Sequence, residues 1–241
     1  MNIIEKLNQK QNDMYGAPPI TIAFLGDSVT HGCFECYMKT EDFIETVYDY
    51  RSAYSTRFRE IMNVLYPNVQ INVINSGISG DNAMRGAARI ERDVLPFNPD
   101  MVVVSYGLND SGQGIDGLKN YEKGLSDIFK ILNEKDIETV FITQNVMNSH
   151  ISPHLKEEKL RNLADTFANN IQNNGVLHAY FEKAKEVCER YGIKVCDLHA
   201  VWERLQAIGV DTTELLSNKL NHPIREFHYY MAIKLIETIL L

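Results

Sequence analysis

The stretch that decides the fold is ITIAFLGDSVTHG, residues 20–32, an apolar run that ends in a tight polar turn. β-Branched and aromatic residues make up much of the run, which favours a buried strand. Four further runs have the same character: VQINVINSG from Val69, MVVVSYG from Met101, TVFITQN from Thr139 and IKVCDLH from Ile193. Near-continuous apolarity, instead of strict alternation, indicates parallel strands that are covered on both faces.

Segments with helical spacing separate these runs. Apolar residues three and four positions apart predict helices around residues 53–65, 121–132 and 160–171, a short one at 202–208 and a terminal one at about 226–240. Strands that alternate with helices imply right-handed crossovers. The sequence therefore predicts an α/β fold of three layers, α/β/α, around a doubly wound, five-stranded parallel sheet.

We expect the whole chain, residues 1–241, to form one domain. It is long enough to bury one core, and no repeat, linker or low-complexity stretch interrupts the pattern. Residues 1–18 precede the first strand as an N-terminal extension. Residues 33–50 form a loop that is longer than a strand-to-helix turn needs, and such loops often carry specificity. Its aromatic residues are expected either to line a substrate pocket near the site or to be buried in a homo-oligomer.

The composition disfavours several classes of partner. Hydrophobic residues make up 44% and charged residues 23%, as in soluble globular proteins. A net charge of −8 leaves no broad basic surface for nucleic acid or an anionic membrane. The polar N-terminus and the lack of a long apolar run predict a cytoplasmic protein. The four cysteines, of which only Cys33 and Cys36 lie close together, are expected to be reduced and free of metal.

Chemically useful residues follow the first three strands, at the edge where doubly wound sheets place their sites. Ser28, Gly77 and Asn109 occupy these positions, and His222 stands near the C-terminus. A serine hydroxyl becomes a nucleophile when a base takes its proton, and histidine is the usual base. The oxyanion of acyl transfer needs N–H donors, which the backbones of Ser28 and Gly77 and the Asn109 side chain can supply.

These blocks resemble the GDSL, or SGNH, hydrolase family of esterases, lipases, thioesterases and carbohydrate deacetylases. The hallmark Ser, Gly, Asn and His of that family match Ser28, Gly77, Asn109 and His222, in the same order. The resemblance implies a flavodoxin-like sheet and a serine esterase with Ser28 as nucleophile and His222 as base. It also implies an oxyanion hole formed by Ser28, Gly77 and Asn109, and no metal or cofactor. The Gly-x-Ser-x-Gly elbow of α/β-hydrolases is absent around Ser28.

One position departs from the family pattern. The family usually has an aspartate three residues before the histidine, where this chain has Lys219. A lysine cannot accept the imidazole N–H. Three explanations are open: another acceptor, such as Asn218, Glu214 or a main-chain carbonyl, takes its place; Asp211 reaches in; or the protein is a hydrolase kept for binding.

Further polar residues are candidates for the walls of the site. His31 lies three residues beyond Ser28, and Asp81 and Arg85 follow Gly77, so these three are expected to bind a polar substrate. For Asp81 and Arg85 the alternative is a solvated ion pair at helical spacing. His150 and His154 follow the fourth strand, but no carboxylate or cysteine lies near them at the spacing of metal ligands.

We therefore expect a carboxylic ester hydrolase that removes short acyl groups, such as acetyl, from a sugar-like or other polar small molecule. Within the enzymes, a thioesterase or lysophospholipase is the alternative. A non-catalytic ligand-binding protein on the hydrolase fold is the alternative from a different class. It is considered because Lys219 stands at the usual aspartate position.

Overall fold

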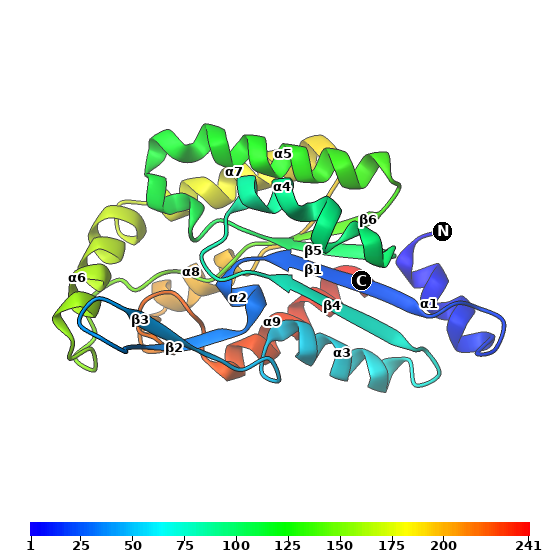
Figure 1. Ribbon diagram of the computed structural model, residues 1–241, viewed down its shortest axis with the longest axis horizontal. Helices are drawn as coiled ribbons and strands as arrows, with labels where there is room; N and C mark the ends of the chain where they lie inside the picture. Colours follow the sequence, from blue (N-terminus) through cyan, green and yellow to red (C-terminus); the bar gives the residue numbers. More distant parts are fainter.

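A computed structural model covers residues 1–241 and confirms the predicted fold, with a five-stranded parallel sheet between layers of helices (Figure 1). The order of the strands across the sheet is β4-β1-β5-β6-β7, and each neighbouring pair is parallel. The strands of this sheet are β1 (Ile20–Gly26), β4 (Ile71–Gly77), β5 (Met101–Ser105), β6 (Glu138–Ile142) and β7 (Lys194–Cys196).

The winding of the chain reverses at β1, which lies between β4 and β5. In doubly wound sheets such a switch point opens a crevice at the carboxyl ends of the strands. The register places Gly26, the last residue of β1, level with Gly77 of β4 and Ser105 of β5. The segments that follow these three strands therefore start side by side. Ser28 lies in the segment after β1.

Helices cover both faces of the sheet. In Figure 1, α3 (Tyr54–Leu65) and α9 (Arg225–Leu240) lie below it, and α4 (Ala83–Asp93), α5 (Leu118–Glu134) and α7 (Val176–Tyr191) lie above it. One continuous core of buried apolar side chains joins the strands to both layers. The helices α3, α5 and α9 fall where the apolar spacing predicts them, whereas α4 and α7 are absent from the predicted set. All five place an apolar face toward the sheet because burial of that face stabilises them.

The first 18 residues are more than an extension, because they contain helix α1 (Ile3–Asn12). Asn2 caps this helix and Glu5 reaches back to the Asn2 backbone, which is a capping box. The side chains of Ile3 and Leu7 are buried in the main core. This segment therefore contributes to the packing of the domain.

The segment that we expected to be a loop after residue 32 is instead a two-stranded antiparallel hairpin of β2 (Cys33–Met38) and β3 (Ile44–Tyr48). Both strands are rich in aromatic and β-branched residues, and the polar turn between them separates two strand-forming runs. Met38 and Ile44 pack on a small apolar cluster that includes Leu155 of the loop after β6. The prediction was wrong here because only the length of the segment was weighed, and not its β propensity.

Shorter elements complete the chain near the carboxyl edge of the sheet and between the strands. They are α2 (Ser28–His31), η1 (Leu95–Phe97), η2 (Asp110–Gln113), η3 (Ile115–Gly117), α6 (Glu158–Phe167), η4 (Ala168–Gln172) and α8 (His199–Ala207). None of the helices combines the length and the apolar character that crossing a bilayer requires. The four cysteines are free thiols, and all except Cys36 are buried.

Candidate active site

A serine and a histidine from opposite ends of the sequence meet at the switch point. Ser28 begins the four-residue helix α2, directly after β1, and His222 lies in the loop before α9. The distance from Ser28 Oγ to His222 Nε2 is 3.0 Å, which is a hydrogen-bond length. Both residues are almost buried, with 4% and 5% of their surface exposed. The structure therefore brings together the predicted nucleophile and the predicted base.

A main-chain carbonyl takes the place of the missing aspartate. His222 Nδ1 lies 3.0 Å from the carbonyl oxygen of Phe34, in strand β2. Because a carbonyl oxygen can only accept, this hydrogen bond requires the ring proton on Nδ1. The other ring nitrogen, Nε2, is then free to accept the Ser28 hydroxyl proton. The ring is held in the tautomer that a triad aspartate would select.

The loop before His222 is held by other groups, and Lys219 does not contact the imidazole. The Lys219 ammonium donates to the main-chain oxygen of Glu214 at 2.8 Å and pairs with its carboxylate at 3.0 Å. The Asn218 side-chain oxygen accepts three backbone N–H groups in a row, those of Leu220, Asn221 and His222. Asn218 therefore fixes the backbone of the loop and does not orient the ring.

Asp211 lies elsewhere. Its carboxylate accepts the Thr213 N–H and lies 3.5 Å from His150 Nε2, on the surface. Of the acceptors that the sequence left open for His222 Nδ1, only the main-chain carbonyl makes the contact.

Burial controls the protonation of His222. Removal from water disfavours the imidazolium, and it lowers the pKa of His222 to about 4, against the upward pull of the Phe34 carbonyl and Glu35. The imidazole is consequently neutral at pH 7 and can accept a proton. A neutral base at hydrogen-bond distance from a hydroxyl is the arrangement that activates a nucleophile.

The carboxylate beside Ser28 supports the turn. Asp27 is the N-cap of α2, and its Oδ1 accepts the Val29 N–H at 3.0 Å. The Gln144 side-chain amide lies 2.9 Å from both carboxyl oxygens of Asp27. Burial raises the pKa of Asp27 to about 7, although these hydrogen bonds pull it down. Asp27 thus holds the start of α2, where Ser28 projects.

The three predicted oxyanion donors lie in α2 or beside it, but they differ in their present partners. The Ser28 N–H is the first of its helix, so it has no acceptor within the helix. The Asn109 side-chain nitrogen donates to the Asp81 carbonyl at 2.8 Å and lies 3.5 Å from Asp27. The Gly77 N–H donates to the Asn75 side chain at 3.0 Å.

Gly77 is required at its position for packing. A Cβ at this position would come within 2.3 Å of the His31 backbone nitrogen. The absence of a side chain allows the end of β4 to lie directly against α2.

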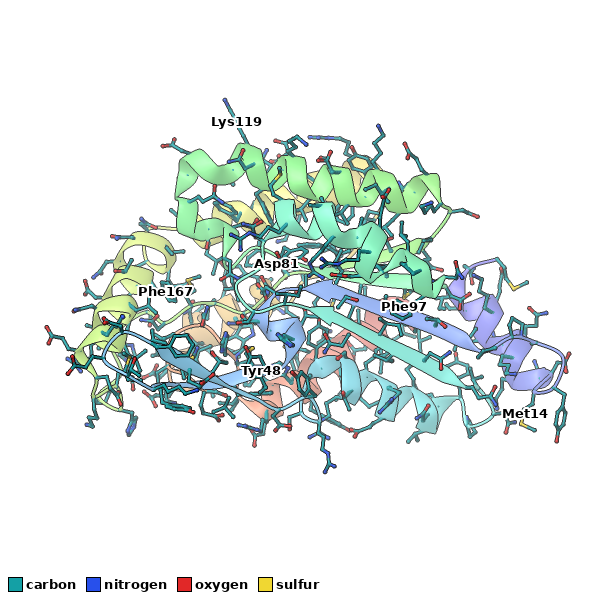
Figure 2. The ribbon with its side chains drawn as sticks, viewed as in Figure 1. Met14, Tyr48, Asp81, Phe97, Lys119 and Phe167 are labelled. Atoms are coloured by element: carbon teal, nitrogen blue, oxygen red, sulfur yellow. The ribbon has the colours of Figure 1, made fainter.

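The predicted substrate-binding residues are placed in different ways. Asp81 is buried near the carboxyl end of β1, where Figure 2 labels it. Its carboxylate meets the Arg89 guanidinium at 2.7 Å and accepts the Tyr106 hydroxyl at 2.9 Å. Arg85 is exposed and lies 3.4 Å from the Gly80 carbonyl, so it does not pair with Asp81. The ion pair at helical spacing that we considered is therefore replaced by a buried pair of Asp81 with Arg89.

His31 lies at the end of α2 and is half-buried. Its Nδ1 accepts the Ser79 N–H at 3.2 Å, and its Nε2 is 3.4 Å from the Tyr50 hydroxyl. Its ring lies edge-on to Tyr48 with 4.9 Å between the ring centres. Burial and the nearby Arg89 lower the pKa of His31 below its usual value. His31 therefore joins the hairpin to the segment after β4.

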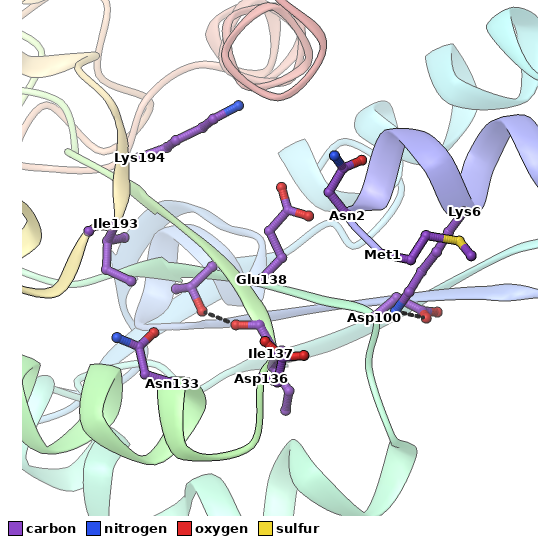
Figure 3. A pocket seen from close by; sticks show the side chains of 12 residues that line it. Met1, Asn2, Lys6, Asp100, Asn133, Asp136, Ile137, Glu138, Ile193 and Lys194 are labelled. Carbon is purple, nitrogen blue, oxygen red and sulfur yellow. Dashed lines mark hydrogen bonds and ion pairs between the residues drawn. The ribbon is translucent and has the colours of Figure 1, made fainter.

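A hollow of about 480 Å³ lies at the far end of the sheet (Figure 3). It is lined by residues that precede β5 or begin β6 and β7, and by the ion pair of Lys6 with Asp100. In α/β sheets of this type sites form at the opposite, carboxyl ends of the strands. The Ser28–His222 pair, and not this hollow, is the candidate active site.

A serine and a neutral histidine paired at the carboxyl edge of a doubly wound sheet form the arrangement of a serine hydrolase. The chain belongs to the GDSL-like Lipase/Acylhydrolase family, whose sequence profile matches residues 24–228. This family is a class of carboxylic ester hydrolases, as the strand-end motifs indicated.

Comparison with single proteins agrees with this membership. An acetylxylan esterase of Geobacillus stearothermophilus is 32% identical over 89 residues, which are 37% of this chain and 39% of that enzyme. The crystal structure of an acetyl xylan esterase has a TM-score of 0.66 and 19% identity, with 92% of this chain and 100% of that chain covered.

A two-domain esterase active on acetylated mannans has a TM-score of 0.65 and 17% identity, with 99% of this chain and 53% of that chain covered. This chain therefore spans about half the length of that esterase. The match to the acetylxylan esterase sequence is shorter still. At such low identities the two structures show that the fold is shared.

Two groups at the site were not found from the sequence. The Phe34 carbonyl carries no sequence signal, because any residue has a carbonyl and only the fold shows where it points. Gln144 did have a signal, since it follows β6 at the same edge as the other strand-end residues. Gln144 lies within the fourth apolar run, TVFITQN, and was given no role there.

Proposed function

We propose that this protein is a serine esterase that removes short acyl groups, acetyl above all, from a sugar-like small molecule. The observation that carries the proposal is the 3.0 Å contact of Ser28 Oγ with a His222 ring whose Nδ1 faces a carbonyl. The alternative from a different class, a non-catalytic ligand-binding protein, was considered because Lys219 stands at the usual aspartate position. The case for it is weaker, because the His222 ring has an acceptor and Lys219 pairs with Glu214 instead.

The reaction follows from the tautomer. Ser28 Oγ attacks the acyl carbon of the ester while its proton passes to His222 Nε2. The imidazolium that forms keeps its Nδ1–H on the Phe34 carbonyl. His222 then gives the proton to the leaving alcohol oxygen as the C–O bond of the ester breaks. Water, with its proton accepted by the same Nε2, releases the acyl group from Ser28 in the second half-reaction.

The oxyanion requires donors that point at the tetrahedral centre. The Ser28 N–H is the donor without an intrahelical partner, and Asn109 has one amide hydrogen on the long, 3.5 Å contact to Asp27. We assign these two groups the main share of the oxyanion contacts. The Gly77 N–H contributes once its hydrogen bond to Asn75 opens.

The preference for acetylated sugars draws on the relatives. The partial sequence match is to an acetylxylan esterase. One similar structure is that of an esterase active on acetylated mannans, which was also crystallised with mannopentaose. Both points favour a small acyl group on a polar molecule.

The experiment compares p-nitrophenyl acetate hydrolysis by the wild type, Ser28→Ala and His222→Ala, with Ser79→Ala as a matched control from the exposed loop after β4. We expect both site variants to lose at least about 10³-fold in kcat/KM, and the control to keep the wild-type rate. Longer p-nitrophenyl esters should be hydrolysed more slowly than the acetate.

A fluorophosphonate probe separates the two classes of function. The probe should label the wild type and Ser79→Ala but not Ser28→Ala. Equal turnover of Ser28→Ala and the wild type would overturn the mechanism. An unlabelled wild type that still binds acetylated oligosaccharides would favour the binding protein, and a preference for long acyl chains would favour the lysophospholipase or thioesterase.

A further inference from the structure

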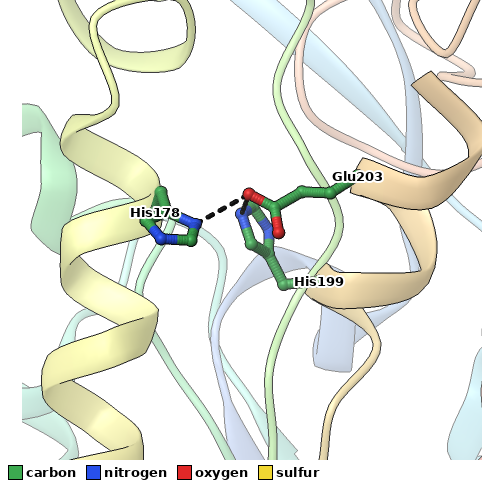
Figure 4. Close-up of side chains that lie close together, drawn as sticks. All are labelled: His178, His199 and Glu203. Atoms are coloured by element: carbon green, nitrogen blue, oxygen red, sulfur yellow. Dashed lines mark hydrogen bonds and ion pairs between the residues drawn. The ribbon is translucent and has the colours of Figure 1, made fainter. Parts of the chain in front are cut away.

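Two histidines and a glutamate gather beside the sheet, apart from the Ser28–His222 pair (Figure 4). His178 lies on α7, and His199 and Glu203 lie one turn apart on α8. His178 Nδ1 is 2.7 Å from Glu203 Oε1, and His199 Nε2 is 3.5 Å from the same oxygen. One nitrogen of each ring and one carboxylate oxygen lie within 4.8 Å of one another. The two rings thus converge on one carboxylate.

His199 is the unusual member of this group. Only 2% of its surface is exposed, yet neither ring nitrogen has a hydrogen-bond partner. The 3.5 Å contact with Glu203 does not have the geometry of a hydrogen bond. Buried polar atoms without partners are rare because they lose their bonds to water and gain nothing in return. An ordinary core histidine donates or accepts a hydrogen bond at one ring nitrogen at least. The His199 ring does so at neither nitrogen.

The ring of His199 is nevertheless fixed in place. It packs on Phe181 with 4.6 Å between the ring centres, and its backbone N–H donates to Thr143 Oγ1 at 2.9 Å. The ring centre of His178 is 6.2 Å away. His199 Nε2 therefore points at the carboxylate because packing directs it there, and not because a hydrogen bond does.

We propose that His178, His199 and Glu203 bind a divalent transition-metal ion, for which Zn²⁺ is the best match. Two imidazole nitrogens and one carboxylate oxygen are a common zinc donor set, with a fourth, open position for water. Zinc bonds of about 2.0–2.1 Å in a tetrahedron place donor atoms roughly 3.3 Å apart. The observed 2.7 and 3.5 Å separations bracket that spacing.

The site is accessible from one side. The side chains of His178 and Glu203 are 53% and 38% exposed, whereas His199 forms the buried wall. An ion can enter from solvent, and water can complete its coordination. A bound ion would supply the missing partner of His199 Nε2 and would join α7 to α8. The family resemblance implied no metal, and no short motif links these residues. His178 is 21 positions before His199, so only packing of the two helices brings them together.

The test uses the untagged full chain, freed of metal with a chelator and titrated with Zn²⁺ against a chromophoric competitor. We expect one equivalent to bind, with affinity at least about tenfold weaker in Glu203→Gln and in His178→Asn. Both residues are partly exposed, so both variants should fold. His150→Asn is the matched control, because His150 lies in a second, more exposed group with Asp211 and Glu214.

Thermal unfolding gives a second readout that is independent of catalysis. Zn²⁺ should raise the Tm of the wild type and of His150→Asn, and should leave the Tm of Glu203→Gln and His178→Asn unchanged. Absence of stoichiometric binding in the wild type would overturn the proposal. Binding that survives in both site variants but is lost in His150→Asn would overturn it as well.

Discussion

At the scale of single residues, orientation of His222 depends on a backbone atom. The Phe34 carbonyl accepts from Nδ1 at 3.0 Å, and the lysine at the usual aspartate position faces away toward Glu214. A carbonyl selects the same tautomer as a carboxylate but carries no full charge. It therefore stabilises the imidazolium less, which is consistent with the pKa of about 4 that burial sets for His222.

Lys219→Asn should leave kcat/KM within about threefold of the wild type, because the Lys219 ammonium does not touch the imidazole. Asparagine also tolerates the left-handed backbone of this position, where φ is 57°. Asn218→Ala is the contrasting variant, since it removes the acceptor of three loop N–H groups. We expect it to lower turnover by about tenfold or more. Steady-state kinetics of both variants would contradict this account if Lys219→Asn were the more damaged.

The pH dependence of turnover should report the buried imidazole. With the pKa of His222 at about 4, the base is neutral and competent throughout pH 5–8. Activity should fall only as the pH drops through about 4, where His222 takes up a proton. The measurement is kcat/KM from pH 3.5 to 8, with circular dichroism at each pH to confirm folding. A midpoint near 6.5 would mean that the ring is solvated in the working enzyme.

At the scale of elements, the β2–β3 hairpin supplies the acceptor for His222, and α9 holds that strand in place. Arg225, the first residue of α9, donates to both oxygens of the Glu35 carboxylate and donates to Asp49 at 2.9 Å. Its guanidinium lies over the Phe34 ring at 4.4 Å. The residue that bears the carbonyl is thus clamped by a planar, forked cation.

Arg225→Lys should lower kcat by about 10- to 100-fold with a smaller change in KM. Lysine keeps the charge but loses the fork that holds Glu35 and Asp49 together, and a shift of about 1 Å at a catalytic group can cost roughly 10²-fold. Arg57→Lys is the matched control, because Arg57 makes an exposed pair with Glu60 on α3. The same rate for Arg225→Lys as for the control would show that the hairpin needs no clamp.

At the scale of the whole molecule, two kinds of buried titratable group change the stability of the fold in opposite directions as the pH falls. Burial lowers the pKa of His222 to about 4 and of His228 to about 3. Between these pKa values and about pH 6.5, the two histidines are protonated in the unfolded chain but neutral in the folded chain, so acid destabilises the fold. Burial raises the pKa of Asp27 and of Asp110 to about 7. Between about 3.8 and 7 the folded chain binds those protons, so acid stabilises it.

Asp27→Asn should make stability more sensitive to acid. The substitution removes a carboxyl group whose protonation in the folded chain stabilises the fold in acid. The buried histidines, which destabilise the fold in acid, remain. The Tm should therefore drop further between pH 7 and 5 than in the wild type. The comparison is of the change in Tm, because loss of the Gln144 contacts lowers stability at every pH. Asp116→Asn, at an exposed acid in η3, is the control and should follow the wild type. Parallel curves for all three proteins would contradict the raised pKa of Asp27.

The predictions from sequence succeeded where the residue type alone indicates the structural or chemical role. Apolar runs in a parallel sheet are buried on both faces, so the five strands were visible without any knowledge of their neighbours. Ser28 and His222 were paired through the chemistry that a hydroxyl and an imidazole share. Asp81 was harder, because its expected partner was Arg85 and its actual partner is Arg89, one helical turn further on. Either arginine satisfies the local spacing, and only the packing of α4 on β1 decides between them.

The five buried strands, the layers of helices on both faces of the sheet and the candidate serine–histidine pair were encoded in local pattern and side-chain chemistry. The acceptor of His222, the clamp of Arg225 and the group of His178, His199 and Glu203 depended on tertiary structure alone. Each of these joins atoms that are far apart in the chain, and one of them is a backbone carbonyl that no residue type distinguishes. Distances of about 3 Å between such atoms arise from the packing of whole elements, which short patterns of residues do not specify.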